Sequence, residues 1–138
     1  MSDPLVAIGR IASSGLSAQS ARLRIIAENM ANVNSTGLTP GSIPYQRKTI
    51  SFKEAMDSAA QADGVKIARI STDKAPFILK YEPGHPAADS KGYVKYPNVN
   101  SIVEMADMRE ANRSYEANLQ VIRQAKDLVS QTIDLLRN

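Results

Sequence analysis

The sequence predicts a mainly α-helical protein with a small β insertion, and three observations carry this prediction. Apolar residues recur at helical spacing near the start of the chain and again over its last third. Six of the seven prolines lie between these two stretches. Short apolar runs in that middle region have the composition of strands. We therefore expect an elongated antiparallel two-helix coiled coil from the N- and C-terminal segments, with a short β-rich region between them.

The first helix is expected to span residues 4–31. Ser2, Asp3 and Pro4 form a typical N-cap and first turn, and the polar stretch Asn32–Gly37 ends the helix. The stripe, taken as a candidate interface, consists of Leu5, Ile8, Ala12, Leu16, Leu23, Ile26 and Met30, with Gln19 as its polar member. Gly9 and Gly15 each weaken a helix by about 1 kcal/mol relative to alanine. Their presence predicts the close approach of a neighbouring helix.

The second helix is expected over residues 101–137, with an alternation of three and four that is typical of a coiled-coil seam. Its seam positions, also candidate interface residues, are Met105, Met108, Asn112, Tyr115, Leu119, Ile122, Lys126, Val129, Ile133 and Leu136. Asn112 and Lys126 would fix register and partner at a cost in stability. Ile102, Leu128 and Leu135 lie off this seam, which predicts a second contact face.

The two helices would be about 42 Å and about 55 Å long. A compact chain of this size has a diameter of only about 37 Å. The seams therefore exceed what one chain can cover, and we expect other chains to cover the rest.

The middle region, residues 38–100, is predicted to be a β-rich insertion into a discontinuous helical domain of residues 1–37 and 101–138. Its expected strands are Tyr45–Phe52, Val65–Ser71, Phe77–Tyr81 and Tyr93–Tyr96, with Phe77, Leu79 and Tyr81 on one half-buried face. Ser51–Asp63 is expected to form a short helix, since Ser51 and Glu54 match a capping box. Pro83 and Gly84 suit a type II turn.

Composition argues against most chemistry. The chain of 138 residues has no cysteine and one histidine, which excludes thiolate sites and leaves little for metal or triad chemistry. The net charge of +3 is small and lies in the middle of the chain, and acidic residues occur within a few positions of the basic ones, so nucleic-acid binding is not favoured. His85 with Asp89, and the carboxylates Glu104, Asp107 and Glu110, are more typical of a turn and of a solvated helix face. We expect no enzyme activity, catalytic residue, cofactor or metal, and neither a cleaved signal peptide nor a membrane span.

Three stretches are more particular than a generic coiled coil. They are Ile25–Gly37, Tyr81–Asn100 with its Pro-Gly-His-Pro segment, and Glu104–Asn118. The first resembles the N-terminal signature of bacterial flagellar rod and hook proteins, and the three together, with Gly41–Arg47 and the small size, resemble the proximal rod proteins of that axial family. The motif residues are Ala31, Asn32, Asn34, Thr36, Pro97, Asn98, Asn100, Tyr115, Glu116, Ala117 and Asn118.

The resemblance implies a structural subunit of the proximal rod of the flagellar basal body, which polymerises helically into the drive shaft that crosses the periplasm for motility. It implies other copies of the chain, other rod proteins, the rod-to-ring adaptor and the inner-membrane ring as partners. It also implies export from the cytoplasm through the flagellar type III apparatus without a cleaved signal. In such a protein the turn with Asn29, Asn32 and Asn34 would satisfy backbone groups at the helix end. The alternatives are another rod or hook subunit, a soluble coiled-coil adaptor, or a nucleic-acid-binding regulator.

Overall fold

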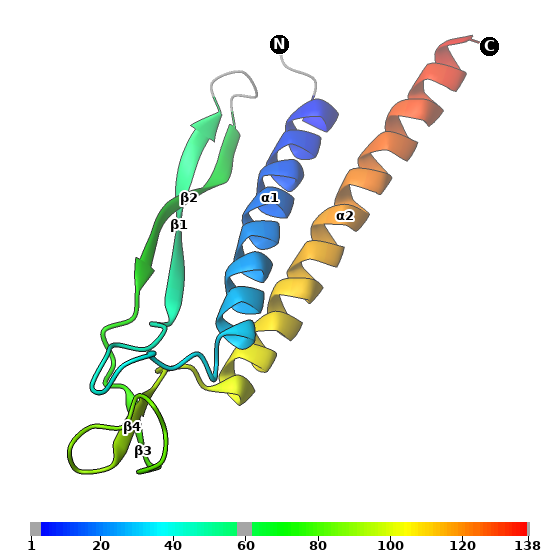
Figure 1. The fold of residues 1–138 in the computed structure, drawn as a ribbon. Coiled ribbons are helices and arrows are strands. Elements are labelled where there is room, and N and C mark those ends of the chain that lie inside the picture. The colour runs from blue at the N-terminus through cyan, green and yellow to red at the C-terminus, as the bar shows by residue number, and fades with distance from the viewer. Residues whose placement is uncertain (1–3, 58–61, 138) are drawn as a thin grey trace. The chain divides into compact units, whose positions relative to one another are not determined.

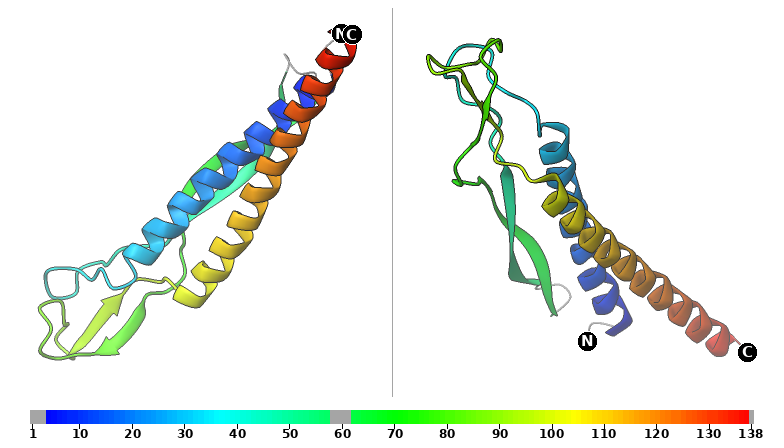
Figure 2. Two further views of the ribbon diagram at one scale, coloured as in Figure 1. Left: turned by 90° about the vertical axis from the view of Figure 1, so that its right-hand side faces the viewer. Right: turned by 90° about the horizontal axis from the view of Figure 1, so that it is seen from below.

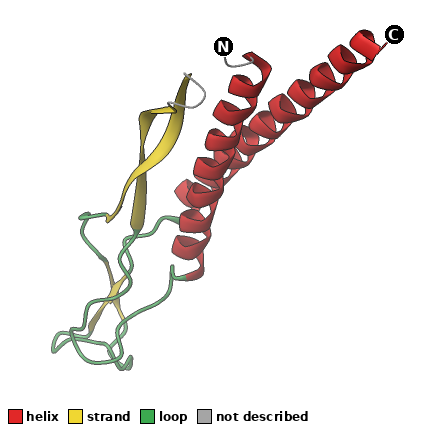
Figure 3. Cartoon of the chain, turned by 90° about the horizontal axis from the view of Figure 1, so that it is seen from above, coloured by secondary structure: helices red, strands yellow, loops and turns green. Residues whose placement is uncertain are grey.

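The computed structural model describes residues 4–57 and 62–137 (Figures 1 and 3). It has two long helices, and the described strands lie between them in the order of the chain. The elements in chain order are α1 (Pro4–Ala31), β1 (Lys48–Asp57), β2 (Ala62–Thr72), β3 (Ile78–Tyr81), β4 (Tyr93–Tyr96) and α2 (Ser101–Arg137). The predicted mainly α-helical chain with a β insertion is confirmed. Both helices have the predicted bounds, although the proposed N-cap residues Ser2 and Asp3 lie outside the described residues.

The chain forms two compact units, and each is described separately. The first unit contains residues up to Leu23, Ser51–Arg69 and the chain from Arg109 onward. The second unit contains Arg24–Ile50 and Ile70–Met108. Each helix and each of the strands β1 and β2 contributes to both units.

In the first unit, α1 and α2 pack antiparallel. Arg22 Nη1 lies 3.5 Å from Glu110 Oε1, and about two turns away on each helix Gly15 lies against Asn118. The buried apolar residues described in this unit are all alanines: Ala12, Ala18, Ala111 and Ala125. Small side chains let two helix backbones approach closely but bury little apolar area.

The β1–β2 hairpin replaces the helix expected over Ser51–Asp63, so that prediction is wrong for the described part of the segment; residues 58–61 lie outside it. Ser51 Oγ donates to the Arg69 carbonyl oxygen at 3.4 Å, and Val65 N–H donates to Ser14 Oγ on α1 at 3.0 Å. The β-branched run of β2 supplies a pairing partner for Ser51 and its neighbours, which outweighs the local capping pattern.

In the second unit, β3 and β4 form a two-stranded antiparallel ribbon (Figure 2), with Ile78 opposite Tyr96 and Tyr81 opposite Tyr93. Val94 is fully buried and, with Ile25, Ile26, Ala87 and Val99, forms the apolar core of the unit. Leu79 and Tyr81 are 60% and 65% exposed, so the half-buried face predicted for them is wrong. Only one face of this ribbon is covered, and it is the face that carries Val94 of β4. Leu79 and Tyr81 lie on the other face.

The turn at Glu82–Pro86 is present, but it is not type II. A type II turn needs a positive φ at Gly84, whereas the positive-φ glycines are Gly41 and Gly92. His85 N–H donates to the Glu82 carbonyl oxygen at 3.0 Å, which closes a turn that ordinary φ values permit. Gly92, with φ of 84°, is where glycine is required, because a Cβ would also lie 2.8 Å from the Tyr81 ring.

Candidate assembly interface

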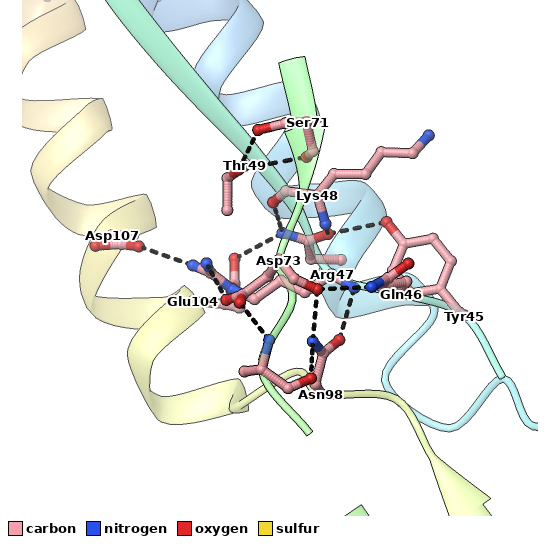
Figure 4. A network of polar contacts seen from close by, with 12 residues as sticks. Tyr45, Gln46, Arg47, Lys48, Thr49, Ser71, Asp73, Asn98, Glu104 and Asp107 are labelled. Carbon is pink, nitrogen blue, oxygen red and sulfur yellow. Dashed lines mark hydrogen bonds and ion pairs between the residues drawn. The ribbon is translucent and has the colours of Figure 1, made fainter. Parts of the chain in front are cut away.

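A buried polar cluster joins the end of α1 to the start of α2 within the second unit (Figure 4). We call Asn29, Arg47, Asp73, Glu104 and Asp107 the Glu104 cluster. The Glu104 carboxylate is fully buried and accepts hydrogen bonds from Arg47 Nε at 2.5 Å and from Asn29 Nδ2 at 3.3 Å. Arg47 also lies 3.5 Å from Asp73 Oδ2 and 3.6 Å from Asp107 Oδ2. One guanidinium therefore faces three carboxylates.

Asn29 connects this cluster to the start of β1. Its Nδ2 donates to the Lys48 carbonyl oxygen at 2.9 Å, and Lys48 N–H donates to its Oδ1 at 2.8 Å. The Tyr45 hydroxyl donates to the same Oδ1 at 2.9 Å, and Lys48 Nζ pairs with Glu28. The prediction that the asparagine turn satisfies helix-end groups is correct for Asn32, whose Nδ2 donates to the Glu28 carbonyl oxygen at 2.8 Å. It is wrong for Asn29, which satisfies a strand instead.

Electrostatics around the cluster follow from burial and from its carboxylates. Burial raises the pKa of Tyr45, and the charges of Glu28 and Glu104 raise it further. Partial burial lowers the pKa of Arg47, but the hydrogen bond to Glu104 and the charges of Glu104, Asp73 and Asp107 outweigh that effect. The net pKa of Arg47 is raised. The cluster's polar groups are thus engaged with one another, which is what a structural tie requires.

Two more asparagines of the predicted motif fix the approach to α2. Asn98 Oδ1 accepts from Arg47 N–H at 2.8 Å, and its Nδ2 donates to the carbonyl oxygens of Asp73 and Ala75. Asn100 is the N-cap of α2, since its Oδ1 accepts from Ile102 N–H at 3.0 Å. Sequence reasoning missed Arg47 and placed Glu104 on a solvated face, which is wrong.

The covered side of α2 agrees with the predicted seam at every second position. At the positions between, the covered residue comes one place earlier in the sequence than the predicted one. Met108, Tyr115, Leu119, Ile122 and Val129 are half-buried, but Met105, Asn112, Lys126, Ile133 and Leu136 are exposed. The buried positions instead are Glu104, Ala111 and Ala125, with half-buried Asn118 between the alanines. The strict alternation of three and four placed the seam at Asn112 and Lys126, whereas the alanines one position earlier are the buried residues. Within one chain, Asn112 and Lys126 therefore do not act as buried polar seam residues.

The predicted stripe of α1 is mostly covered. Ala12 and Ile26 are buried, Leu5, Leu16, Leu23 and Met30 are half-buried, and Ile8 is 44% exposed. Gln19 carries a buried Oε1 without a hydrogen-bond partner among the described residues. Gly15 makes the predicted close approach, since a Cβ there would lie 2.9 Å from Asn118 Oδ1. Gly9 does not, because a Cβ there would have nothing within 4 Å.

The remaining motif residues have mixed surroundings. Pro97 is buried, Thr36 is half-buried, and Ala31, Asn34, Glu116 and Ala117 are exposed. His85 Nδ1 accepts from Ala87 N–H, and Asp89 Oδ1 accepts from the N–H groups of Lys91 and Tyr93, so both side chains stabilise turns. These backbone hydrogen bonds lower the pKa of Asp89.

Over residues 4–57 and 62–137 there is no group of three or more potential metal ligands. No helix in that part of the chain is both long and apolar enough to span a membrane.

Large apolar side chains remain exposed on α2 away from α1. Ile102, Leu128 and Leu135, the predicted second face, are 78%, 49% and 80% exposed. Leu38 and Ile43, in the loop after α1, are 89% and 72% exposed. Scattered exposed apolar residues are normal, but leucines repeated seven apart on one helix face are typical of a surface that another helix covers. We take Ile102, Leu128 and Leu135 as the candidate assembly face.

Comparison with known proteins identifies the class. Residues 10–39 match the family "Flagella basal body rod protein", and residues 90–135 match "Flagellar basal body rod FlgEFG protein C-terminal". These two segments include the asparagine turn, most of α1 and most of α2. The chain is thus a member of the flagellar basal-body rod proteins.

Whole-chain relatives narrow this to one family. The chain is 58% identical to flagellar basal-body rod protein FlgC of Agrobacterium fabrum over 98% of its own length and 97% of that protein. It is 44% identical to FlgC of Escherichia coli O157:H7, covering 95% and 97% of the two chains. For FlgC of Borreliella burgdorferi the identity is 40%, with 92% and 94% covered. The chain belongs to the FlgC family.

Proposed function

We propose that this chain is a subunit of the proximal rod, where it polymerises helically with copies of itself and with other rod proteins to form the drive shaft for motility. The observation that carries this proposal is the exposed apolar face of α2, Ile102, Leu128 and Leu135, on a chain that belongs to a rod-protein family. Burying such residues in a neighbour contributes about 1.5–3 kcal/mol each. In a single copy these side chains stay exposed, so this stabilisation is gained only on assembly.

The proposal also includes the roles of the two parts of the chain, the partners and the location. Residues 1–37 and 101–138 act as the rod domain, with helices that form coiled-coil contacts across subunits, and residues 38–100 act as an insertion. The partners include the rod-to-ring adaptor, the inner-membrane ring and the flagellar type III export apparatus. The site of action is the periplasm. Open helical polymers arise when different surfaces of identical subunits meet and the rotation does not close.

Charge substitutions on the exposed face test this function. Leu128→Asp with Leu135→Asp places two carboxylates where a neighbour would cover them, which costs several kcal/mol in an interface. The free chain should keep its stability within about 0.5 kcal/mol, because both leucines are exposed. We expect loss of the variant from purified basal bodies and loss of swimming.

Ser130→Asp is the matched control, since Ser130 is exposed on another side of the same helix. Cells with this control should swim normally. Normal swimming and normal basal bodies with the double leucine variant would contradict the assembly face. The adaptor and regulator alternatives predict instead that the wild-type chain stays in the cytosolic fraction and is absent from detergent-resistant basal bodies.

A further inference from the structure

The β1–β2 hairpin presents two basic side chains on one exposed face. Thr49 Oγ1 and Ser71 Oγ lie 3.0 Å apart, so these two residues share a face of the hairpin. Side chains two positions apart on a strand lie on the same face. The exposed residues of this face, which we call the basic hairpin face, are Ser51, Lys53, Ile67 and Arg69. Within the described part of the chain, neither Lys53 nor Arg69 has an ion-pair partner.

The last turns of α2 present two acidic side chains beside two leucines. Asp127 and Asp134 are seven positions apart, as are Leu128 and Leu135, so each pair forms a line along the helix. The two lines are about 100° apart around the helix axis. All four side chains are exposed, and we call them the acidic α2 face. This face contains both leucines of the candidate assembly face.

The cations of α2 do not neutralise this face. Arg123 and Arg137 lie within about one turn of the aspartates, but over residues 4–57 and 62–137 no ion pair joins them to Asp127 or Asp134. Lys126 is two positions before Leu128 and therefore lies on the opposite side of the helix. Both carboxylates are available to a partner.

Each copy keeps both faces open within the first unit. Val65 N–H of β2 donates to Ser14 Oγ, and Asn118 of α2 lies against Gly15. Ser14 and Gly15 are successive residues, about 100° apart around α1, so the hairpin and α2 contact different sides of that helix. The hairpin is held against α1, and the basic hairpin face and the acidic α2 face both stay exposed.

We propose that the basic hairpin face of one copy binds the acidic α2 face of a second copy, with bases paired to carboxylates and isoleucine packed on the leucines. Charge complementarity favours this partner, because each face carries two charges of one sign that the described chain leaves unpaired. The inference rests on the proposed rod function and names what covers Leu128 and Leu135 there.

The spacing of the charges on the two faces is compatible. Asp127 and Asp134 are about 10.5 Å apart along the helix axis. Ser51 Oγ donates to the Arg69 carbonyl oxygen, so Lys53, two positions along β1, is a diagonal neighbour of Arg69. Diagonal neighbours have Cβ atoms about 7–8 Å apart, and long basic side chains can reach beyond that distance. Because two different surfaces meet, the contact joins copies head to tail in an open series.

The absence of cysteine allows a direct test by cross-linking. Ser51→Cys and Gln131→Cys place one thiol on each face without removing a proposed contact, since Gln131 is exposed between the two aspartates. The variant chain is the only copy in the cell, and purified basal bodies are treated with a short bifunctional maleimide. We expect a ladder of products at multiples of 15.0 kDa.

The matched control moves one thiol to the other side of α2. Ile133 is exposed and two positions from Gln131, so it lies on the opposite side of the helix. Ser51→Cys with Ile133→Cys, and each single cysteine variant, should give at least ten-fold less product than Ser51→Cys with Gln131→Cys. An equal yield from the control pair would overturn the assigned face of α2.

Charge reversal provides a second readout. Lys53→Glu with Arg69→Glu, added to the cysteine pair, should lower the ladder yield about five-fold. Further addition of Asp127→Lys with Asp134→Lys should restore it, which a folding defect of the reversed hairpin would not allow. A yield that reversal leaves unchanged would overturn the charge pairing.

Two outcomes separate this contact from the rod function. Basal bodies that contain the chain but give no ladder, or give products of other masses, would overturn the contact and leave the rod function standing. Basal bodies that lack even the wild-type chain would overturn the rod function itself.

Discussion

The side-chain amide of Asn29 exchanges two hydrogen bonds with the backbone of Lys48, one donated by Nδ2 at 2.9 Å and one accepted by Oδ1 at 2.8 Å. A single helix residue thus acts as the pairing partner of the first residue of β1. The same amide donates to Glu104 at the start of α2. Asn29 is only 1% exposed, and its hydrogen bonds connect the end of α1, the start of β1 and the start of α2 within the second unit.

Asn29→Ala should lower the free energy of unfolding by about 2 kcal/mol, because it leaves backbone groups of Lys48 and one side of Glu104 without their partner. Urea unfolding measures the change. Asn34→Ala is the control from the same motif, since Asn34 is exposed. Its effect should stay within about 0.5 kcal/mol. Equal effects of the two substitutions would refute the role given to Asn29.

Arg47→Met should be more damaging than any surface arginine substitution. It removes the cation that faces Glu104, Asp73 and Asp107, and it leaves the Glu104 carboxylate buried with Asn29 as its remaining hydrogen-bond partner. Breaking one side of a buried ion pair costs about 3–5 kcal/mol. Because Arg47 is itself partly exposed, the lower end of that range is expected, again from urea unfolding. Arg123→Met, at an exposed position of α2, should cost less than about 0.5 kcal/mol.

The two glycines of α1 should respond differently to alanine. Gly9→Ala should raise the free energy of unfolding by about 0.5–1 kcal/mol, because alanine favours the helix and the new methyl group meets nothing. Gly15→Ala should lose this gain, because its Cβ would lie 2.9–3.1 Å from the side chain of Asn118. Thermal unfolding of both variants provides the comparison. A stabilised Gly15→Ala would mean that Asn118 moves away without cost.

Stability should fall at alkaline pH through Tyr45. Its pKa is raised by burial and then by Glu28 and Glu104, so the folded state keeps the phenolic proton at a pH where the unfolded state has lost it. Stability from this group is therefore fully present below about pH 10, the ordinary tyrosine pKa, and is lost as pH rises toward the folded pKa. Tyr45→Phe should show a shallower decline of the unfolding free energy above pH 10 than the wild-type chain. Parallel declines would rule out this linkage.

Features set by neighbours in sequence could be predicted, and those set by distant partners could not. Both helices were predicted to their terminal residues because the apolar period and the asparagine turn are local signals. The buried state of Glu104 depends on Arg47, 57 positions earlier, and no local pattern indicates such a pair. A charged residue in a helix is usually solvated, so the sequence analysis placed Glu104 on a solvated face. In the second unit Glu104 is instead fully buried.

The covered side of α2 shows a second limit. The alternation of three and four pointed to Asn112 and Lys126, whereas the neighbouring Ala111 and Ala125 are the buried residues. Backbone proximity, rather than side-chain size, decides which residues become buried when two helices meet at alanines. Leu128 and Leu135, which break the seam period, are exposed in the single chain, and the second contact face expected for them stays a prediction.

The most direct test of the central claim is a map of the intact basal body at side-chain resolution. We predict that α1 and α2 of this chain fit density in the proximal rod, with Ile102, Leu128 and Leu135 covered by neighbouring subunits. A rod with no density for this chain, or one in which these three side chains face solvent, would contradict the claim.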